Sequence, residues 1–217
     1  MQTAPSEQRK VPRPRADAVR NRERIVDAAR EMFVLYGPQS PLDEIARRAG
    51  VGNATVYRNF PDREALVREV VCSVLDRVAE NAEEALAKDG DAFAGLSRFM
   101  HVVADAKINA LCPMMASNFD QHHPDLEAAR HRIESLVEAL MARARAAGQL
   151  RGDVAPGDLM VVVAQLSRPP AGTVSSERFV HRHLQLFLDG LRADGPRAPA
   201  RPVLPGTAPT LEDLRQN

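Results

Sequence analysis

The side chains between residues 53 and 63 have the chemistry of a protein that contacts nucleic acid. An arginine can donate two hydrogen bonds to guanine, an asparagine can pair with adenine, and a small alanine can touch a thymine methyl group. Asn53, Ala54 and Arg58 are therefore the candidates for contacts with base edges, and the sequence leaves open which of them makes one. These residues share one polar face, which suits a major groove, and the whole face comprises Asn53, Ala54, Thr55, Tyr57, Arg58 and Asn59.

Enzyme chemistry has no comparable signal in this chain. The sequence has no nucleophile elbow, no glycine loop that cradles phosphate, no dinucleotide fingerprint and no paired metal-ligand motif. We therefore expect a protein that is not an enzyme and that carries no cofactor.

Short helices separated by glycine turns are predicted to hold the polar face in place. A first helix is expected from about residue 17 to 36, because Gly37 and Pro38 follow it. A second is expected over about 42–49, with Ser40 as its N-cap, Pro41 at its first position and a near capping box. Gly50-Val51-Gly52 then ends it.

A third short helix is predicted to follow this break and to end before Pro61-Asp62, with Asn53 able to cap it. Apolar residues at helical spacing would pack these two short helices against the first, whose own apolar face contains Ile25, Ala28, Ala29, Met32 and Phe33. Two short helices joined by a glycine turn form a helix-turn-helix. The apolar set of the pair is Leu42, Ile45, Ala46, Ala49, Val51, Val56 and Phe60.

The segment over residues 42–66, LDEIARRAGVGNATVYRNFPDREAL, closely resembles the DNA-binding signature of the TetR (AcrR-like) family of regulators. The resemblance continues upstream through residues 24–29 and, at lower specificity, downstream to residues 147–151 and 188–192. It implies a transcriptional regulator, most often a repressor. It also implies that Thr55 and Tyr57 bind phosphate through their hydroxyls and that Arg63 contacts phosphate.

Several polar residues near this segment keep two interpretations open. Asn53 could simply cap its helix and Asn59 could simply satisfy backbone groups. The basic residues near the N-terminus form either a solvated tail or an arm that follows the neighbouring phosphates or minor groove. These residues are Arg13, Arg15, Arg20 and Arg22.

A long helix starting at Asp62 is predicted to lead into a second helical lobe, with helices near 91–106, 109–118, 124–147, 156–167 and 175–193. In the resembled family the corresponding lobe encloses a pocket for a small-molecule inducer. Apolar side chains of these helices, including three methionines that would give a pliable lining, are the candidates. For each candidate taken singly, ordinary core packing is the alternative. The candidates are Val74, Phe99, Met100, Val103, Met114, Met115, Phe119, Leu136 and Leu140.

Two helices near the C-terminus have more apolar surface than one chain can cover. Residues 159–166 are apolar on nearly every face, and the last helix carries two apolar stripes. Pairing these helices across a two-fold axis would form a four-helix homodimer interface. The candidates for this interface are Leu159, Val162, Leu166, Phe179, His183 and Leu186.

The composition fits an all-helical protein, because the chain has few aromatic residues and few runs of β-branched residues. Its formal net charge is zero, yet residues 1–24 have seven basic and three acidic residues, a local surplus of four (7 − 3). We expect a flexible basic arm over 1–16, a DNA-binding domain over 17–61, a ligand-binding and dimerisation domain over 62–194, and a flexible proline-rich tail over 195–217.

Neither a transmembrane helix nor a secretory signal is recognisable, and Cys72 and Cys112 are expected to be reduced core residues. A cytoplasmic protein is therefore predicted.

Three histidines lie near Asp120 and Asp125, namely His122, His123 and His131. They are better explained as surface groups or as a polar pocket mouth than as a metal site. His123 is also expected to be an approximate N-cap of the helix that follows.

These predictions combine into a homodimeric, ligand-responsive regulator that binds a palindromic double-stranded DNA operator. Two other functions remain open, namely a transcriptional activator and a DNA-binding protein without control by a small molecule. The effector and the operator sequence are not encoded in any recognisable motif.

Overall fold

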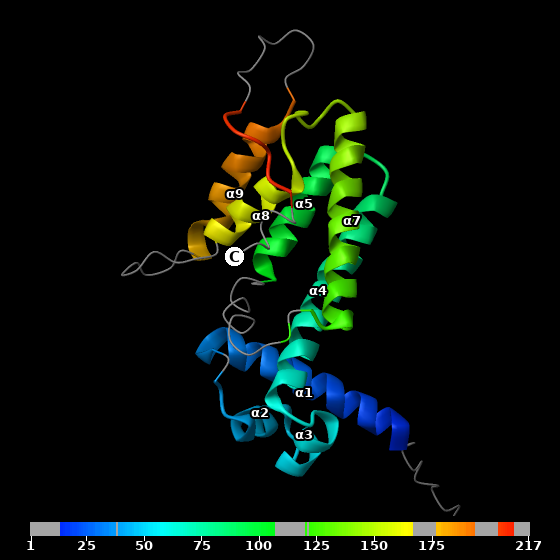
Figure 1. Cartoon of the computed structure of the whole chain (residues 1–217), viewed down its shortest axis with the longest axis vertical. Helices are drawn as coiled ribbons and strands as arrows, with labels where there is room; N and C mark the ends of the chain where they lie inside the picture. Colours follow the sequence, from blue (N-terminus) through cyan, green and yellow to red (C-terminus); the bar gives the residue numbers. More distant parts are fainter. Residues whose placement is uncertain are drawn as a thin grey trace, which may run out of the picture. The chain divides into compact units, whose positions relative to one another are not determined.

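The computed structural model describes residues 14–37, 39–106, 120, 122–166, 177–193 and 204–210. Within these ranges every element is a helix, apart from one isolated β-bridge, and eight helices are present (Figure 1). The chain divides into two compact units, residues 1–70 and 71–217. The prediction of an all-helical fold is therefore confirmed.

The N-terminal unit is built on three helices, α1 (Pro14–Tyr36), α2 (Leu42–Ala49) and α3 (Asn53–Asn59). α1 packs against both α2 and α3. It begins three residues earlier than predicted, because a proline is tolerated at the first helical position, where its missing N–H is not needed. The predicted apolar face of α1 is buried, as are the apolar residues of the helix pair apart from the half-buried Leu42 and Val51.

Ser40 does not cap α2, contrary to the sequence prediction. The residue at the N-cap position is Pro41, and no side chain caps this helix end. The buried Ser40 hydroxyl instead lies 2.8 Å from the carbonyl oxygen of Gly37 and 3.1 Å from that of Met32. Ser40 therefore donates to a carbonyl in the last turns of α1 and to one in the turn that follows, and it does not cap α2.

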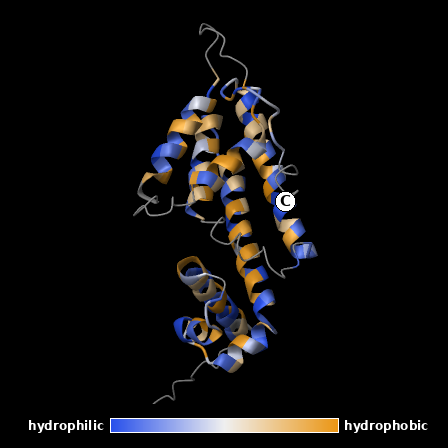
Figure 2. Cartoon of the chain, turned by 60° about the vertical axis from the view of Figure 1, so that its left-hand side comes forward, coloured by the Kyte–Doolittle hydropathy of each residue, from blue (hydrophilic) through white to orange (hydrophobic). Residues whose placement is uncertain are grey.

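The C-terminal unit contains most of α4 (Arg63–Ala87), which starts in the first unit, together with α5 (Ala92–Asp105), α7 (Pro124–Ala146), α8 (Pro156–Leu166) and α9 (Glu177–Leu191). These bounds lie close to those predicted, and the helix expected at 109–118 falls outside the described residues. α5 packs against α7, α8 and α9. Figure 2 shows that the helices carry both hydrophobic and hydrophilic residues, as amphipathic helices do.

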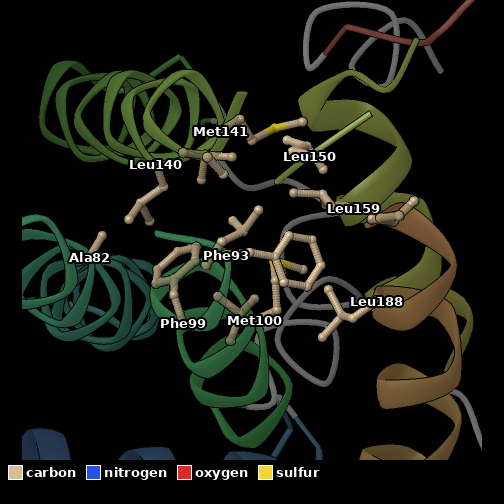
Figure 3. Packing of buried hydrophobic residues seen from close by; sticks show 14 of the residues in the cluster. Ala82, Phe93, Phe99, Met100, Leu140, Met141, Leu150, Leu159 and Leu188 are labelled. Carbon is tan, nitrogen blue, oxygen red and sulfur yellow. The ribbon is translucent and has the colours of Figure 1, made fainter. Parts of the chain in front are cut away.

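One hydrophobic cluster fills the C-terminal unit between these helices (Figure 3). Phe99, Met100, Val103 and Leu140, which were pocket candidates, are fully buried members of it. Leu136 is partly buried against the cluster, and Val74 is buried in α4. The described candidates are thus buried or partly buried, and their assignment to a pocket stays a prediction. The other three, Met114, Met115 and Phe119, lie outside the described residues.

Two segments far apart in the sequence close this unit together. The N–H of Arg151 donates to the carbonyl of Leu191, and the N–H of Ala193 donates to the carbonyl of Gln149, at 3.1 and 2.9 Å. The side-chain oxygen of Gln149 also accepts a hydrogen bond from the N–H of Phe93 at the start of α5. The loop after α7 therefore connects the start of α5 with the end of α9.

Residues 204–210 contact the start of α8, which differs from the expectation of a flexible tail for this segment. The carbonyl of Pro209 accepts a hydrogen bond of 3.0 Å from the N–H of Gly157, one of the N–H groups that a helix start leaves without an internal partner. A Cβ atom on residue 157 would collide with the Pro209 backbone. The N–H of Leu204 also donates to Asp153.

The Arg151–Asp153 pair beside this tail gives a pH-dependent prediction. Two hydrogen bonds of 2.6 and 2.8 Å from the Arg151 guanidinium lower the pKa of the Asp153 carboxyl from 3.8 to about 2, and the N–H of Leu204 contributes in the same direction. Because folding lowers this pKa, the pair stabilises the fold above about pH 4 and loses that contribution as the pH falls towards 2.

We therefore expect the difference in melting temperature between the native chain and Asp153→Asn to be constant above about pH 4 and to shrink between pH 4 and 2. Thermal unfolding at a series of pH values measures this difference. A difference that grows on acidification would contradict the assignment.

No helix in the described ranges has both the length and the apolar composition needed to cross a membrane.

Candidate DNA-binding site

The turn between α2 and α3 sets the direction in which α3 leaves α2. Gly50 has a left-handed backbone (φ +64°), its N–H donates to the carbonyl of Arg47, and the N–H of Val51 donates to that of Ala46. These two bonds form a Schellman motif, in which glycine is favoured because it has no Cβ atom. The glycine predicted to break the helix is thus the residue that ends it.

Replacing Gly50 with alanine is expected to destabilise the N-terminal unit by about 1 kcal/mol, because a left-handed backbone costs a non-glycine residue roughly 1–2 kcal/mol. Gly50→Asn is the matched control, since asparagine tolerates this backbone better. Chemical denaturation should place Gly50→Asn between the native chain and Gly50→Ala. Equal loss in the two variants would show that backbone conformation is not the cause.

Helix α3 buries one side and leaves the other in solvent. Val56 is 1% exposed and packs into the core, while Asn53, Ala54, Tyr57 and Arg58 are exposed. The Tyr57 side chain is notable, because a large aromatic residue is 54% exposed on a seven-residue helix. The predicted polar face therefore exists as one continuous surface, to which the half-buried Thr55 and Asn59 also belong.

The polar side chains of this face also make contacts within the protein. Arg58 folds back along its own helix, with hydrogen bonds of 3.0 Å to the carbonyl of Ala54 and 3.4 Å to the Thr55 hydroxyl. Asn59 donates to the carbonyl of Thr55, which is the purely structural role left open by the sequence. Because the Arg58 contacts are exposed and weak, they present little obstacle to binding a base edge.

Asn53 does not cap α3, because the N-cap residue is Gly52 and no side chain caps this helix end. The Asn53 amide instead donates to the carboxylate of Asp43 at 2.9 Å, which connects the start of α3 to the start of α2. Its position at the exposed start of the helix is compatible with DNA contact, and the bond to Asp43 uses only one of the two amide N–H groups and leaves the side-chain oxygen out.

Arg63 and Arg22 have structural contacts that sequence reasoning did not find. Arg63 is half-buried and donates a hydrogen bond of 2.8 Å to the carbonyl of Ser40. Arg22, considered above as part of a tail or arm, donates to both carboxylate oxygens of Glu69, and its guanidinium lies 4.4 Å from the centre of the Phe60 ring. Arg22 thus holds α1 against α4 and the end of α3, a role that no local pattern reveals.

The remaining basic residues of the N-terminus divide between described and undescribed parts of the chain. Arg20 pairs with Asp17 three residues earlier on α1. Arg13 and the side chain of Arg15 lie outside the described residues.

In the C-terminal unit, one face of α9 is exposed although it is apolar. Phe179 and Leu186 are 51% and 60% exposed, and the rings of Phe179 and His183 are perpendicular, with their centres 6.4 Å apart. The opposite face is buried through Leu184, Leu188 and Leu191. The two stripes predicted for this helix are therefore both present, and among the described residues only the stripe of Leu184, Leu188 and Leu191 is buried.

The interface candidates on α8 differ from one another in burial. Val162 and Leu166 are partly buried, whereas Leu159 is fully buried in the core of its own chain and cannot reach a partner. The exposed apolar residue on this helix is Val161, at 37%. We therefore replace Leu159 with Val161 in the interface considered below.

The histidines near Asp120 and Asp125 have ordinary partners. His123 caps α7 by accepting the N–H of Asp125, as the sequence suggested, and His122 pairs with Glu127. His131 pairs with Glu134 on the same helix. Across the described part of the chain, no group of three or more His, Cys, Asp or Glu side chains is arranged to hold a metal ion.

Comparison with known families agrees with this geometry in both units. The model described as "Bacterial regulatory proteins, tetR family" matches residues 25–70. The model described as "Transcriptional regulator SbtR-like, C-terminal domain" matches residues 89–193. The first match contains the whole helix-turn-helix.

Individual relatives extend the similarity over most of the chain. The uncharacterized HTH-type transcriptional regulator MT2310 of Mycobacterium tuberculosis is 32% identical over 162 residues, which are 70% of this chain and 82% of the relative. The crystal structure of the TetR transcriptional regulator SCO0520 from Streptomyces coelicolor superposes with a TM-score of 0.64 at 32% identity, covering 80% of this chain and 99% of that one.

A third relative is the HTH-type transcriptional repressor LfrR of Mycolicibacterium smegmatis, 38% identical over 87 residues, which are 40% of this chain and 45% of LfrR. A crystal structure of LfrR from Mycobacterium smegmatis in complex with proflavine has the same fold, with a TM-score of 0.62 at 23% identity, covering 80% of this chain and 96% of that one. Taken with the matches over both units, these similarities show that the chain belongs to the TetR family of DNA-binding transcriptional regulators and has an SbtR-like C-terminal domain.

Proposed function

We propose that this protein is a homodimeric repressor that leaves a palindromic operator when a small molecule binds to its C-terminal unit. The observation that carries the proposal is the exposed polar face of α3, where Tyr57 and Arg58 stand free of the core beside Ala54. A helix that presents such a face from a helix-turn-helix has the geometry of a reader of the major groove.

In the proposed complex, the side chains of α3 divide between two kinds of contact. Arg58, Asn53 and Ala54 contact base edges, which specify the sequence. Thr55, Tyr57 and Arg63 contact phosphates, which position the helix without reading the sequence.

The exposed apolar face of α9 supports the dimer. Phe179 and Leu186, with His183 between them, form a stripe that water does not favour, and Val161 adds to the exposed apolar surface of the adjacent α8. A second copy related by a two-fold axis would cover this stripe with an identical one. The two helix-turn-helix units of such a dimer would bind half-sites about 34 Å apart, one turn of DNA.

The small-molecule response is supported by LfrR, which is named a repressor and whose structure holds proflavine. In this chain, helix α4 starts in the DNA-binding unit and continues into the C-terminal unit, so a ligand that shifts its second half acts on both. Ligand binding and DNA release then share one coupling free energy, typically about 1–3 kcal/mol. We place the ligand in the C-terminal unit, where Met114 and Met115 stay candidate contacts from the sequence.

The test begins with the selection of bound sequences from random DNA, followed by a screen for small molecules that release the selected operator. A releasing molecule should bind the free protein about 5 to 150 times more tightly than the operator complex, because coupling between two sites is reciprocal. Calorimetry on the free protein and on the saturated complex measures both affinities. Equal affinities would refute the release mechanism, and transcription that falls when the gene is deleted would identify an activator instead.

A further inference from the structure

Two histidines from different helices of the C-terminal unit meet at the α5–α9 contact. Nδ1 of His101 lies 2.8 Å from Nδ1 of His181. The centres of the two rings are 5.0 Å apart and their planes are inclined by 26°. Because the nitrogen atoms are much closer than the ring centres, the rings meet edge to edge and their Nδ1 atoms face one another.

The outer nitrogen of each ring is held by a hydrogen-bond acceptor. Nε2 of His181 lies 2.9 Å from the carboxylate of Asp105. Nε2 of His101 lies 3.0 Å from the side-chain oxygen of Gln185, whose amide nitrogen donates to Asp189. Both acceptors require a hydrogen on Nε2, so in the neutral rings both Nδ1 atoms keep their lone pairs. Two lone pairs at 2.8 Å repel one another unless a cation lies between them.

The fold fixes this arrangement on two packed helices. His101 and Asp105 are four residues apart on α5, and His181 and Gln185 are four residues apart on α9, so each pair shares one helix face. The helices are held together by buried apolar residues of the core below the histidines. The side chain of His181 is half exposed, which leaves room for water on the solvent side.

We propose that His101 and His181 bind a divalent transition-metal ion through their Nδ1 atoms, with water completing its coordination. Imidazole nitrogens suit Zn²⁺, Ni²⁺ and Cu²⁺. Tetrahedral Zn²⁺ with bonds of about 2.0–2.1 Å needs nitrogens about 3.3 Å apart, so the rings must move apart by about 0.5 Å and tilt until both Nδ1 lone pairs point at the ion. Asp105 and Gln185 then act as positioning residues, since the partner of the outer N–H orients a metal-binding histidine.

Zn²⁺ titration of the full-length chain, in competition with a chromophoric chelator, tests the site. We expect His181→Ala and His101→Ala each to remove the same single equivalent of Zn²⁺ per chain. Asp105→Ala should keep that equivalent and weaken its affinity about 10- to 100-fold. His131→Ala is the matched control, because His131 lies on α7 and its Nδ1 pairs with Glu134 on the same helix, and its stoichiometry should equal that of the native chain.

Cu²⁺ provides an independent readout, because its electron paramagnetic resonance spectrum counts bound imidazole nitrogens. Two nitrogens in the native chain and one in His181→Ala support the site, with circular dichroism confirming that both proteins are folded. Zn²⁺ binding that is the same in the native chain and in both histidine variants overturns the proposal. Absence of Zn²⁺ binding in the native chain also overturns it and leaves a shared proton as the cation between the rings.

Discussion

The double variant Phe179→Arg with Leu186→Arg is expected to convert the proposed dimer into a monomer and to weaken operator binding by about 10² to 10⁴-fold. Both side chains are more than half exposed in the single chain, so the substitutions leave its core intact. In a dimer they would place arginines in a dry interface, where an unpaired charge costs several kcal/mol. Operator binding then falls because each monomer holds only one half-site.

Sedimentation at micromolar concentration measures the first effect, and titration of the selected operator measures the second. Val19→Arg is the control, because Val19 is an equally exposed apolar residue on α1, away from α9 in the sequence and in a different unit. The control should remain dimeric, and circular dichroism should show the same helical content in all three proteins. A native chain that sediments as a monomer would refute the dimer outright.

The helix-turn-helix could be predicted from the sequence because its determinants are local. Gly37 and Gly50 each adopt a positive φ at the positions where the sequence predicted helix ends. The apolar residues of the three helices recur at helical spacing, so their burial follows from the pattern alone. The outward face of α3 is then what remains after the buried residues are removed.

Contacts between distant residues were not predictable in the same way. A serine followed by a proline has the local pattern of a helix start. The Ser40 hydroxyl instead donates to the carbonyl of Met32, which the turn between α1 and α2 brings close. Arg22 reaches Glu69, 47 residues away, and no periodic signal connects them. Leu159 belongs to a helix that is apolar on nearly every face, so the sequence alone could not determine which side faces its own core.

The tail illustrates the same limit for a backbone contact. The prolines indicated correctly that residues 204–210 form no helix. The carbonyl oxygens of a segment outside a helix remain available to accept hydrogen bonds. The carbonyl of Pro209 finds the N–H of Gly157, about fifty residues earlier in the sequence. Only a glycine at residue 157 lets the Pro209 backbone come this close. The sequence around residue 157 predicts the start of a helix and nothing about this contact.

Arg58→Ala is expected to weaken binding to the selected operator by about 1–3 kcal/mol, roughly 5- to 150-fold, and to relax the base preference at one position of each half-site. The Arg58 side chain is exposed on α3 and makes only weak contacts within its own helix, so its removal should leave the melting temperature unchanged. Repeating the selection of bound sequences with the variant measures the change in preference.

Arg63→Ala provides the contrasting result. As a phosphate contact, Arg63 should affect all DNA sequences equally, and its loss should reduce the slope of log affinity against log salt concentration by about 0.9. Arg63 also bonds to the carbonyl of Ser40, so this variant is expected to melt at a lower temperature and must be assayed well below that temperature. If Arg58→Ala weakened binding to all DNA sequences equally while Arg63→Ala changed the preferred base, the two roles would be reversed. If neither variant changed DNA binding, α3 and the start of α4 would not face the DNA.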